Sequence, residues 1–433
     1  MPIPMRSNES FIVRESRLSG TVEIPASKSH TIRAVAIGSL AKGVSEIFSP
    51  LVSGDTLASV RIYQALGAKI TIEKGCWIIE GCEGKPTAPK DALNVGNSGT
   101  TLRIAMGSCA LLSKGEAILT GDEQIRKRPS APLVKSLNEL GAKVSSKDCE
   151  GFPPFIVSGR LAGGRTTIEA HTSQYVTSLL INTPLGDGET IIDVPVLNEK
   201  SYVEMTLEWL KSCGIEIKKE NMERFSIPGS QSYSPFIRKI PADFSSATFF
   251  LAAGAMKDND ITCLGLNLND PQSDKVVVDY LSAMGAKVNI HRDSICIKGS
   301  QLKGIDIDMN DTPDALPMMA VVGCFAQGKT RLLNVPQARI KETDRIKVMC
   351  DELSKMGAKI NQLPDGLEIE QSKLKPTRVN GHSDHRVVMA LTIAGLLTEG
   401  ETIIDTAEAA AITFPDFAKC IQGVGGDISV RKN

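Results

Sequence analysis

The stretch "LSAMGAKVNIHRDSICIKG", residues 281–299, carries the pattern that decides the fold. Gly285 stands where an amphipathic helix ends, because glycine can take the left-handed backbone conformation without a Cβ clash. Apolar and polar residues alternate after it, which predicts a strand pair with one buried face. Equivalent glycines recur about every 72 residues, which indicates six copies of one repeat. They are Gly67, Gly141, Gly214, Gly285, Gly357 and Gly425.

Each repeat also contains an earlier helix that is nearly uncharged after its first turn. The six are "SHTIRAVAIGSLA", "SGTTLRIAMGSCALL", "TSQYVTSLLINTPL", "DFSSATFFLAAGAM", "TPDALPMMAVVGCFA" and "SDHRVVMALTIAGLL". Helices that are apolar on most sides are buried inside a domain. Each repeat is therefore expected to run strand, buried helix, strand, amphipathic helix, strand, strand. Three repeats around three buried helices would make one domain.

The repeat count predicts two α/β domains. We expect a hinge near residues 232–243, where Pro235 and Pro241 interrupt the pattern. One domain would comprise residues 23–240, with repeats one to three. The other would comprise residues 1–22 and 241–433. The strand in "FIVRESRLSG" is expected to complete the last sheet, because "IQGVGGDISV" ends the chain one strand short.

The composition, 42% hydrophobic and 23% charged over 433 residues, is that of a folded soluble protein. A net charge of −1 gives no bulk attraction to nucleic acid or to an anionic membrane. The chain shows neither a signal-like start nor an apolar run of about 18 residues, so we expect a cytoplasmic protein. Ten cysteines without a C-x-x-C pair predict free thiols rather than disulfides or a zinc site.

The buried helices begin with polar residues that a core does not favour. A helix N-terminus carries unpaired N–H groups and attracts anions. Serine and threonine can be simple caps there. Lys28 and Arg33 are different, because a cation at this end is disfavoured by about 0.3–1 kcal/mol unless an anion or carboxylate offsets it. If the six N-termini point the same way from their domains, two facing domains would form a cleft for a strongly anionic substrate.

A second cluster of charges lies in "ARIKETDRIKVMCDELSKMG", residues 338–357. Its apolar residues follow helical spacing, which predicts that "KETDR" occupies the first turns of an amphipathic helix. Lys341 and Arg345 would share one face of that helix, with Glu342 and Asp344 between them. A solvated, salt-bridged helix start is the alternative interpretation. The run Arg126, Lys127 and Arg128 is likewise typical of a surface.

Seven motifs, taken together, carry a family resemblance. They are "PASKSHTIR", "GNSGTTLR", "KRP", "TSQY", "PDA", "IKETDR" and "SDHR". Their order and spacing resemble those of the 5-enolpyruvylshikimate-3-phosphate synthases, in the enolpyruvyl transferase family, over the whole chain. The resemblance implies the two-domain enolpyruvyl transferase fold, an inside-out α/β barrel of six βαβαββ repeats. It implies transfer of the enolpyruvyl group of phosphoenolpyruvate to the 5-hydroxyl of shikimate 3-phosphate by a monomer without metal or cofactor, with the active site in the interdomain cleft.

The resemblance also implies the roles of individual residues. Shikimate 3-phosphate would be held by Lys28, Ser29, Arg33, Thr172, Ser173, Gln174, Tyr202, Asp314 and Lys341. Phosphoenolpyruvate would be held by Lys28, Asn97, Gly99, Arg128, Gln174, Arg345, His385 and Arg386. The catalytic residues would be Asp314, Glu342 and Lys28. Asp314 would take the proton of the 5-hydroxyl, and Glu342 would protonate the methylene carbon and later remove a proton.

The sequence departs from the family pattern at several positions. Thr172 stands where serine is usual, Gln337 where many members have asparagine, and Glu199 where some have a phosphate-binding serine. Ile412 replaces a lysine that in some members reaches phosphoenolpyruvate. Ile104 follows Arg103 where many members have proline. Gly99, by contrast, matches the family pattern. Because it has no side chain, it leaves space for glyphosate to compete with phosphoenolpyruvate.

Two other functions are considered. The first is the sister enzyme that acts on UDP-N-acetylglucosamine. It usually carries a cysteine where this chain has Glu123, and Lys-Asn where this chain has Lys28 and Ser29. The second is an anion-binding scaffold that has lost catalysis. The presence of both candidate carboxylates and of all five candidate cations argues against this second function.

Overall fold

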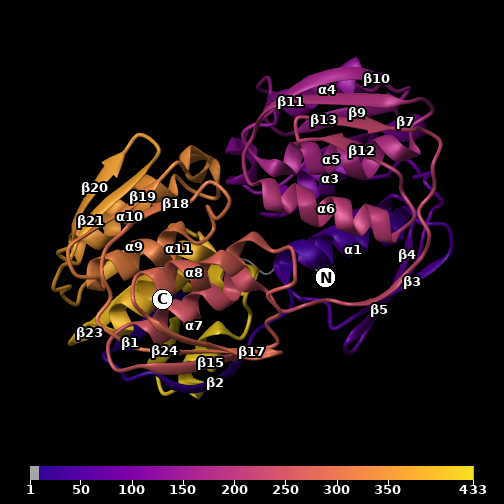
Figure 1. Ribbon diagram of the computed structural model, residues 1–433. Coiled ribbons are helices and arrows are strands. Elements are labelled where there is room, and N and C mark those ends of the chain that lie inside the picture. The colour runs from indigo at the N-terminus through magenta and orange to yellow at the C-terminus, as the bar shows by residue number, and fades with distance from the viewer. Residues whose placement is uncertain (1–8, 433) are drawn as a thin grey trace. The chain divides into compact units, whose positions relative to one another are not determined.

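The computed structural model describes residues 9–432. The chain forms two compact units, which we call unit 1 (residues up to 25 and from 241 onward) and unit 2 (residues 26–240). The division falls between Pro25 and Ala26, whereas the predicted boundary followed residue 22. Each unit contains three four-stranded sheets and three inner helices (Figure 1).

Unit 2 contains the first three repeats. Repeat one comprises α1 (Lys28–Leu40), β3 (Val44–Phe48), α2 (Gly54–Ala65), β4 (Lys69–Glu73), β5 (Cys76–Glu80) and the later strand β14 (Ile237–Lys239). Repeat two comprises β6 (Leu93–Asn94), α3 (Gly99–Cys109), β7 (Leu111–Thr120), η1 (Ile125–Lys127), α4 (Ala131–Glu139), β8 (Lys143–Ser146) and β9 (Phe155–Arg160). Repeat three comprises β10 (Gly164–Ala170), α5 (Ser173–Asn182), η2 (Thr183–Leu185), β11 (Thr190–Leu197), α6 (Lys200–Ser212), β12 (Lys218–Glu220) and β13 (Arg224–Ile227).

Unit 1 contains the other three repeats. Repeat four comprises β2 (Ser19–Glu23), α7 (Phe244–Ala255), β15 (Asp260–Leu264), η3 (Ser273–Val276), α8 (Val277–Ala283), β16 (Lys287–Ile290) and β17 (Ser294–Lys298). Repeat five comprises β18 (Asp306–Asp308), α9 (Leu316–Phe325), β19 (Lys329–Leu333), η4 (Pro336–Ile340), α10 (Arg345–Lys355), β20 (Lys359–Leu363) and β21 (Gly366–Glu370). Repeat six comprises β22 (Arg378–Asn380), α11 (His385–Leu396), β23 (Glu401–Asp405), η5 (Ala407–Ile412), α12 (Phe417–Gly423), β24 (Asp427–Lys432) and the first strand β1 (Glu9–Arg14).

All six sheets share one topology. The first strand of each repeat pairs parallel with the second, and the remaining pairs are antiparallel, as in the order β6-β7-β9-β8. The opening strand β1 lies between β23 and β24, which confirms that it completes the last sheet (Figure 1).

The first strands of repeats one and four come from unexpected places. β2 pairs with β15 in unit 1, and β14 pairs with β3 in unit 2. The segment predicted to be only a hinge therefore contains a strand. Pro235 and Pro241 flank this strand, and in the sequence they indicate a break in the pattern. Proline is nevertheless tolerated at the ends of an edge strand.

The six marker glycines end helices as predicted. Each has a positive φ, from 84° at Gly214 to 107° at Gly67. At Gly141 an added Cβ would also come within 2.9 Å of the Ala162 Cβ. Backbone conformation and close packing therefore both favour glycine at this point of the repeat.

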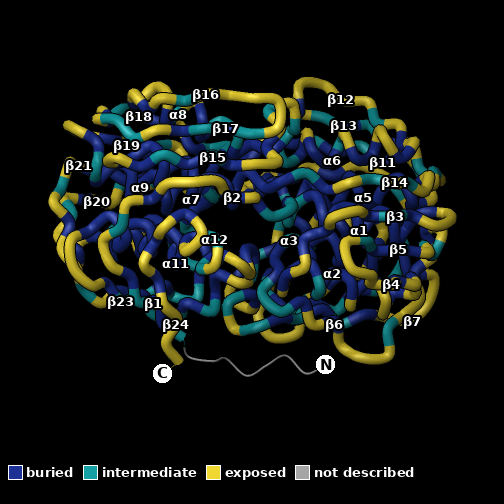
Figure 2. Tube along the Cα trace, turned by 90° about the horizontal axis from the view of Figure 1, so that it is seen from below, coloured by how far each residue is buried: buried dark blue, intermediate teal, exposed yellow. Residues whose placement is uncertain are grey.

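The inner helices are buried around their whole circumference. Every residue of α7 is buried, and the same holds for α11. The inner helices are dark blue in Figure 2, whereas exposed segments such as β16 and its turn are yellow. Since such a helix packs on all sides, its polar first turn is held by a fixed framework.

Candidate functional site

The start of α1 brings Lys28 to a carboxylate. Ser27 caps the helix by accepting a hydrogen bond from the His30 N–H. The Lys28 Nζ lies 3.3 Å from the Asp55 Oδ2, and both side chains are largely buried. Asp55 is in the first turn of α2, where a negative charge is favoured. This pair offsets the unfavourable position of a cation at a helix N-terminus.

Arg33 is buried against the neighbouring helices. Its guanidinium donates to the hydroxyls of Thr206 (2.9 Å) and Thr177 (3.4 Å) and to the carbonyls of Ser29 (3.1 Å) and Tyr202 (3.0 Å). Burial lowers the pKa of Arg33 to about 10. The side chain thus connects α1 to α5 and α6, and it fixes the first turn of α6.

A group of polar side chains gathers at the start of α3. Arg103 Nη1 donates to Gln174 Oε1 at 2.8 Å, and Arg128 Nη2 donates to Asn97 Oδ1 at 2.9 Å. Gly99 lies beside both guanidinium groups: a Cβ there would be 2.7 Å from Arg103 Nη1 and 2.9 Å from Arg128 Nη1. The two cations approach the helix end this closely because residue 99 has no side chain.

The start of α5 holds a buried carboxylate. Glu199 Oε2 accepts hydrogen bonds from Ser173 Oγ (2.7 Å), the Ser173 N–H (3.1 Å) and Thr172 Oγ1 (3.2 Å). Only 2% of Glu199 is exposed. The N-terminus of α5 therefore binds a carboxylate of the chain itself, at residues for which the resemblance implies shikimate 3-phosphate as the ligand. Substrate binding there stays a prediction.

In unit 1, one arginine holds three carboxylates. Arg345 is 1% exposed, and its guanidinium donates to Asp314 Oδ1 (2.6 Å), Glu342 Oε2 (2.6 Å) and Asp384 Oδ2 (2.9 Å). Burial by itself would lower the pKa of Arg345, but Asp384, Glu342 and Asp314 outweigh it and raise the pKa. The guanidinium is charged and fixes the two candidate acid/base residues in one cluster.

Arg386 joins the same cluster from the first turn of α11. Its Nη2 donates to Asp314 Oδ2 at 3.1 Å and its Nη1 to the Ser245 carbonyl at 3.0 Å. His385, beside it, is also buried. The Ser245 hydroxyl donates to Asp274. Burial, with a contribution from Asp314, raises the pKa of Asp274 to about 7.

Comparison with known proteins identifies the family. The model of the EPSP synthase (3-phosphoshikimate 1-carboxyvinyltransferase) family matches residues 12–421. The 3-phosphoshikimate 1-carboxyvinyltransferase of Acetivibrio thermocellus is 53% identical over 417 residues, which cover 96% of this chain and 98% of that protein. The protein of the same name from Methanocaldococcus jannaschii is 43% identical over 429 residues, with 97% and 99% covered. The chain belongs to the EPSP synthase family.

Solved structures confirm the predicted enolpyruvyl transferase fold. The EPSP synthase of Acinetobacter baumannii superposes with a TM-score of 0.83 at 28% identity, covering 98% of this chain and all of that chain (100%). The enolpyruvyl transferase NikO of Streptomyces tendae gives a TM-score of 0.78 at 16% identity, with 99% and 100% covered. The second likeness supports the fold alone.

The family motif "KETDR" differs from its predicted conformation. The prediction that it forms the first turns of a helix is wrong, because α10 begins only at Arg345. Asp344 caps α10 by accepting from the Lys347 N–H, and Lys341 follows η4. Lys341 and Arg345 therefore do not share a helix face. Similarly, α9 begins at Leu316, so Asp314 lies just before the helix.

Three residues that contact the predicted site residues were given no role in the sequence analysis. Asp55, which pairs with Lys28, lies in an amphipathic helix and carried no motif. Asp384 and Arg103 lie in the motifs "SDHR" and "GNSGTTLR", but the resemblance assigns neither of them a role. Their burial, 0% and 4% exposed, is the signal that separates them from surface charges.

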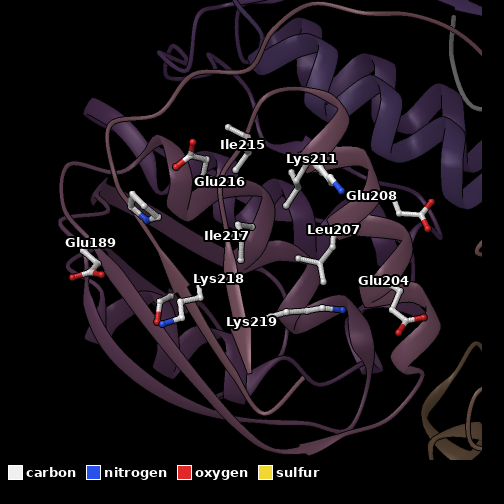
Figure 3. A pocket seen from close by; sticks show the side chains of 13 residues that line it. Glu189, Glu204, Leu207, Glu208, Lys211, Ile215, Glu216, Ile217, Lys218 and Lys219 are labelled. Carbon is white, nitrogen blue, oxygen red and sulfur yellow. The ribbon is translucent and has the colours of Figure 1, made fainter. Parts of the chain in front are cut away.

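A separate pocket in unit 2 contains none of these residues. Its volume is about 1020 Å³, and it lies between α6 and the strands that follow it (Figure 3). Glu204, Glu208, Lys211 and Lys219 line it, and their charges of both signs do not select an anion. Within residues 9–432, no three His, Cys, Asp or Glu side chains are arranged so that they could hold a metal ion. None of the helices in this range has the length and apolar character of a membrane span.

The loop that leads to Asp384 and the start of α11 is held by a buried glutamate, Glu352. Its carboxylate accepts from the Asn380 N–H (3.0 Å) and Lys355 Nζ (2.8 Å) and lies 2.7 Å from His382 Nε2. Burial would raise the pKa of Glu352, but these bonds outweigh it and lower the pKa to about 2.

Replacing Glu352 by glutamine is expected to lower the free energy of unfolding by about 2–3 kcal/mol at pH 7, because charge-assisted bonds are lost. The folded pKa is depressed, so this stability is complete above the unfolded value of 4.5 and is lost as pH falls toward 2. Urea unfolding at several pH values should therefore show the variant and the wild type converging below pH 4.5. Asp351→Asn is the control, because the Asp351 side chain on α10 is 43% exposed, and it should change stability by less than about 1 kcal/mol.

Proposed function

We propose that this chain is a 3-phosphoshikimate 1-carboxyvinyltransferase. It transfers the enolpyruvyl group of phosphoenolpyruvate to the 5-hydroxyl of shikimate 3-phosphate and releases phosphate, a step of chorismate and aromatic amino acid biosynthesis. The observation that carries this proposal is the family match over residues 12–421. The sister reaction on UDP-N-acetylglucosamine is not favoured, because the curated relatives at 40–53% identity carry the shikimate enzyme's name. We also propose a cytoplasmic monomer.

The Arg345 cluster supports an acid/base role for its carboxylates. Arg345 holds Asp314 and Glu342 at 2.6 Å each, so one cation orients both groups. In the proposed mechanism Asp314 accepts the proton of the 5-hydroxyl as that oxygen attacks the central carbon of phosphoenolpyruvate. Glu342 protonates the methylene carbon to give a tetrahedral intermediate. Glu342, now a carboxylate, removes a proton from the new methyl group, which restores the double bond and expels phosphate. The proton held by Asp314 passes to the leaving phosphate.

The remaining predicted residues would bind the two anions. For shikimate 3-phosphate we propose Lys28, Ser29, Arg33, Thr172, Ser173, Gln174, Tyr202 and Lys341, together with Asp314. For phosphoenolpyruvate we propose Lys28, Asn97, Gly99, Arg128, Gln174, Arg345, His385 and Arg386. Arginine suits the carboxylate and phosphate of this substrate, because its planar fork can donate two parallel bonds. Arg33 and Tyr202 would act chiefly through the position of α6, given the internal contacts of Arg33. That the active site lies in an interdomain cleft stays a prediction from the family resemblance.

Phosphate release tests the proposed function. The protein is incubated with phosphoenolpyruvate and either shikimate 3-phosphate or UDP-N-acetylglucosamine, and free phosphate is measured over time. Release that requires shikimate 3-phosphate is expected. Release only with the nucleotide sugar would support the sister reaction, and release with neither would support a scaffold that has lost catalysis.

Gly99→Ala is expected to raise the KM for phosphoenolpyruvate about 10-fold, with a smaller change in kcat, because misplaced binding groups weaken substrate positioning. The new methyl would push the Arg103 and Arg128 guanidinium groups away from the helix end. Gly54→Ala is the matched control, since a Cβ there meets nothing within 4 Å. Initial rates at varied phosphoenolpyruvate measure the effect. An unchanged KM in Gly99→Ala would count against Arg128 as a ligand of phosphoenolpyruvate.

A further inference from the structure

Glu199 presents a negative charge where the proposed function requires an anionic ligand to bind. Thr172 and Ser173 are among the proposed ligands of shikimate 3-phosphate, and some family members have a phosphate-binding serine in place of Glu199. In this structure both hydroxyls and the Ser173 N–H donate to one oxygen, Glu199 Oε2, at 2.7–3.2 Å. A phosphate oxygen at a helix N-terminus would accept hydrogen bonds from the same kinds of donor, hydroxyls and a backbone N–H.

The position of the carboxylate is fixed by the backbone around it. Glu199 has a left-handed conformation, with φ 58° and ψ 46°, and directly precedes α6. The first turn of α6 is held by Arg33, which donates to the Tyr202 carbonyl and to Thr206 on the same helix. With 2% of its surface exposed, Glu199 lies in a protein environment where charge interactions are stronger than in water.

A carboxylate and a phosphate cannot both use this set of donors. Each Ser173 donor has a single hydrogen to give, and the two anions would repel one another at short range. For the phosphate to bind there, the Glu199 carboxylate has to leave the N-terminus of α5 and give up its three bonds.

We propose that Glu199 is an internal anion that occupies the phosphate position of the free protein and lowers its affinity for the sugar phosphate. This inference rests on the proposed function and adds an affinity-setting residue to it. Glu199 stabilises the ligand-free start of α5 and is displaced when shikimate 3-phosphate binds. Removing the charge of Glu199 therefore lowers the Kd of shikimate 3-phosphate and lowers the stability of the ligand-free protein.

The test compares substrate binding by the wild type, Glu199→Gln and Glu199→Ser. Glutamine keeps the shape without the charge, and serine supplies a hydroxyl donor. Titration calorimetry measures the Kd of shikimate 3-phosphate, with shikimate as the probe that lacks phosphate. Glu208→Gln, an exposed position of α6, is the charge control. We expect both Glu199 variants to bind shikimate 3-phosphate about 10-fold tighter. We expect shikimate affinity within about 2-fold of wild type in every protein.

Two further readouts separate this role from a purely structural cap. The Tm without ligand should fall in both Glu199 variants, and the KM for shikimate 3-phosphate should fall while the KM for phosphoenolpyruvate stays unchanged. A lower Tm with an unchanged Kd would overturn the inference, because Glu199 would then only cap α5. Weaker binding would also overturn it, by making Glu199 a substrate ligand. Either result, in a wild-type protein that releases phosphate, leaves the proposed function intact. Absence of shikimate 3-phosphate binding in all three proteins would contradict both.

Discussion

Arg345→Lys is expected to lower kcat at least about 100-fold and the free energy of unfolding by about 3–5 kcal/mol. The Arg345 guanidinium donates to Asp314, Glu342 and Asp384 from a side chain that is 1% exposed. Lysine keeps one positive charge but lacks the planar fork, so its ammonium cannot reach all three carboxylates. The carboxylates left without a donor would repel one another in a buried setting, and the two candidate acid/base residues would lose their fixed positions.

Two measurements check this expectation: urea unfolding, and phosphate release at saturating substrates. Arg331→Lys provides the control, because Arg331 also forms a forked pair, with Asp306, but at an exposed position. It should retain wild-type kcat and lose less than about 1 kcal/mol of stability. Near-normal turnover of Arg345→Lys, or equal losses in both variants, would show that the geometry of the guanidinium is unimportant.

The repeat architecture could be predicted from the sequence because its signals are local. A glycine that ends a helix and an uncharged buried helix each depend on a few neighbouring residues, and they recur six times. The exchange of β2 and β14 could not be predicted. Both strands lie near the crossings between the units, and strand pairing between residues so far apart leaves no local pattern. β2 pairs with β15, more than two hundred residues later in the sequence.

For the candidate site, the sequence predicts which helix ends attract anions, but not which groups of the chain bind at those ends. The chain balances two of these ends itself: Asp55 pairs with Lys28, and Glu199 binds the start of α5. Such partners are ordinary acidic residues in the sequence, and only their burial beside a cation or a helix end gives them a role. The "KETDR" segment illustrates the same limit. The helical spacing after Arg345 predicted a helix that includes Lys341, but Asp344 caps α10 and leaves Glu342 in the preceding loop. From that loop the Glu342 carboxylate accepts a hydrogen bond from Arg345, three residues later.

Asp314→Asn and Glu342→Gln are each expected to lower kcat about 100-fold or more while leaving the Kd of shikimate 3-phosphate nearly unchanged. Both replacements keep the size and the acceptor oxygen of the side chain, so Arg345 retains an acceptor. An amide, however, cannot take up and return a proton at the pH of the reaction. The proposed proton transfers would therefore stop, although the cluster would remain assembled.

The two variants should differ in stability, which helps to separate chemistry from structure. Asp314 accepts from Arg345 through Oδ1 and from Arg386 through Oδ2, so one end of an asparagine amide would face a guanidinium donor. We expect Asp314→Asn to lose about 1–3 kcal/mol for that unsatisfied contact. Glu342→Gln can turn its oxygen toward Arg345, so we expect a smaller loss. Calorimetric titration, urea unfolding and phosphate release measure the three quantities. If either variant turned over at the wild-type rate, its carboxylate could not be the proton-transfer group.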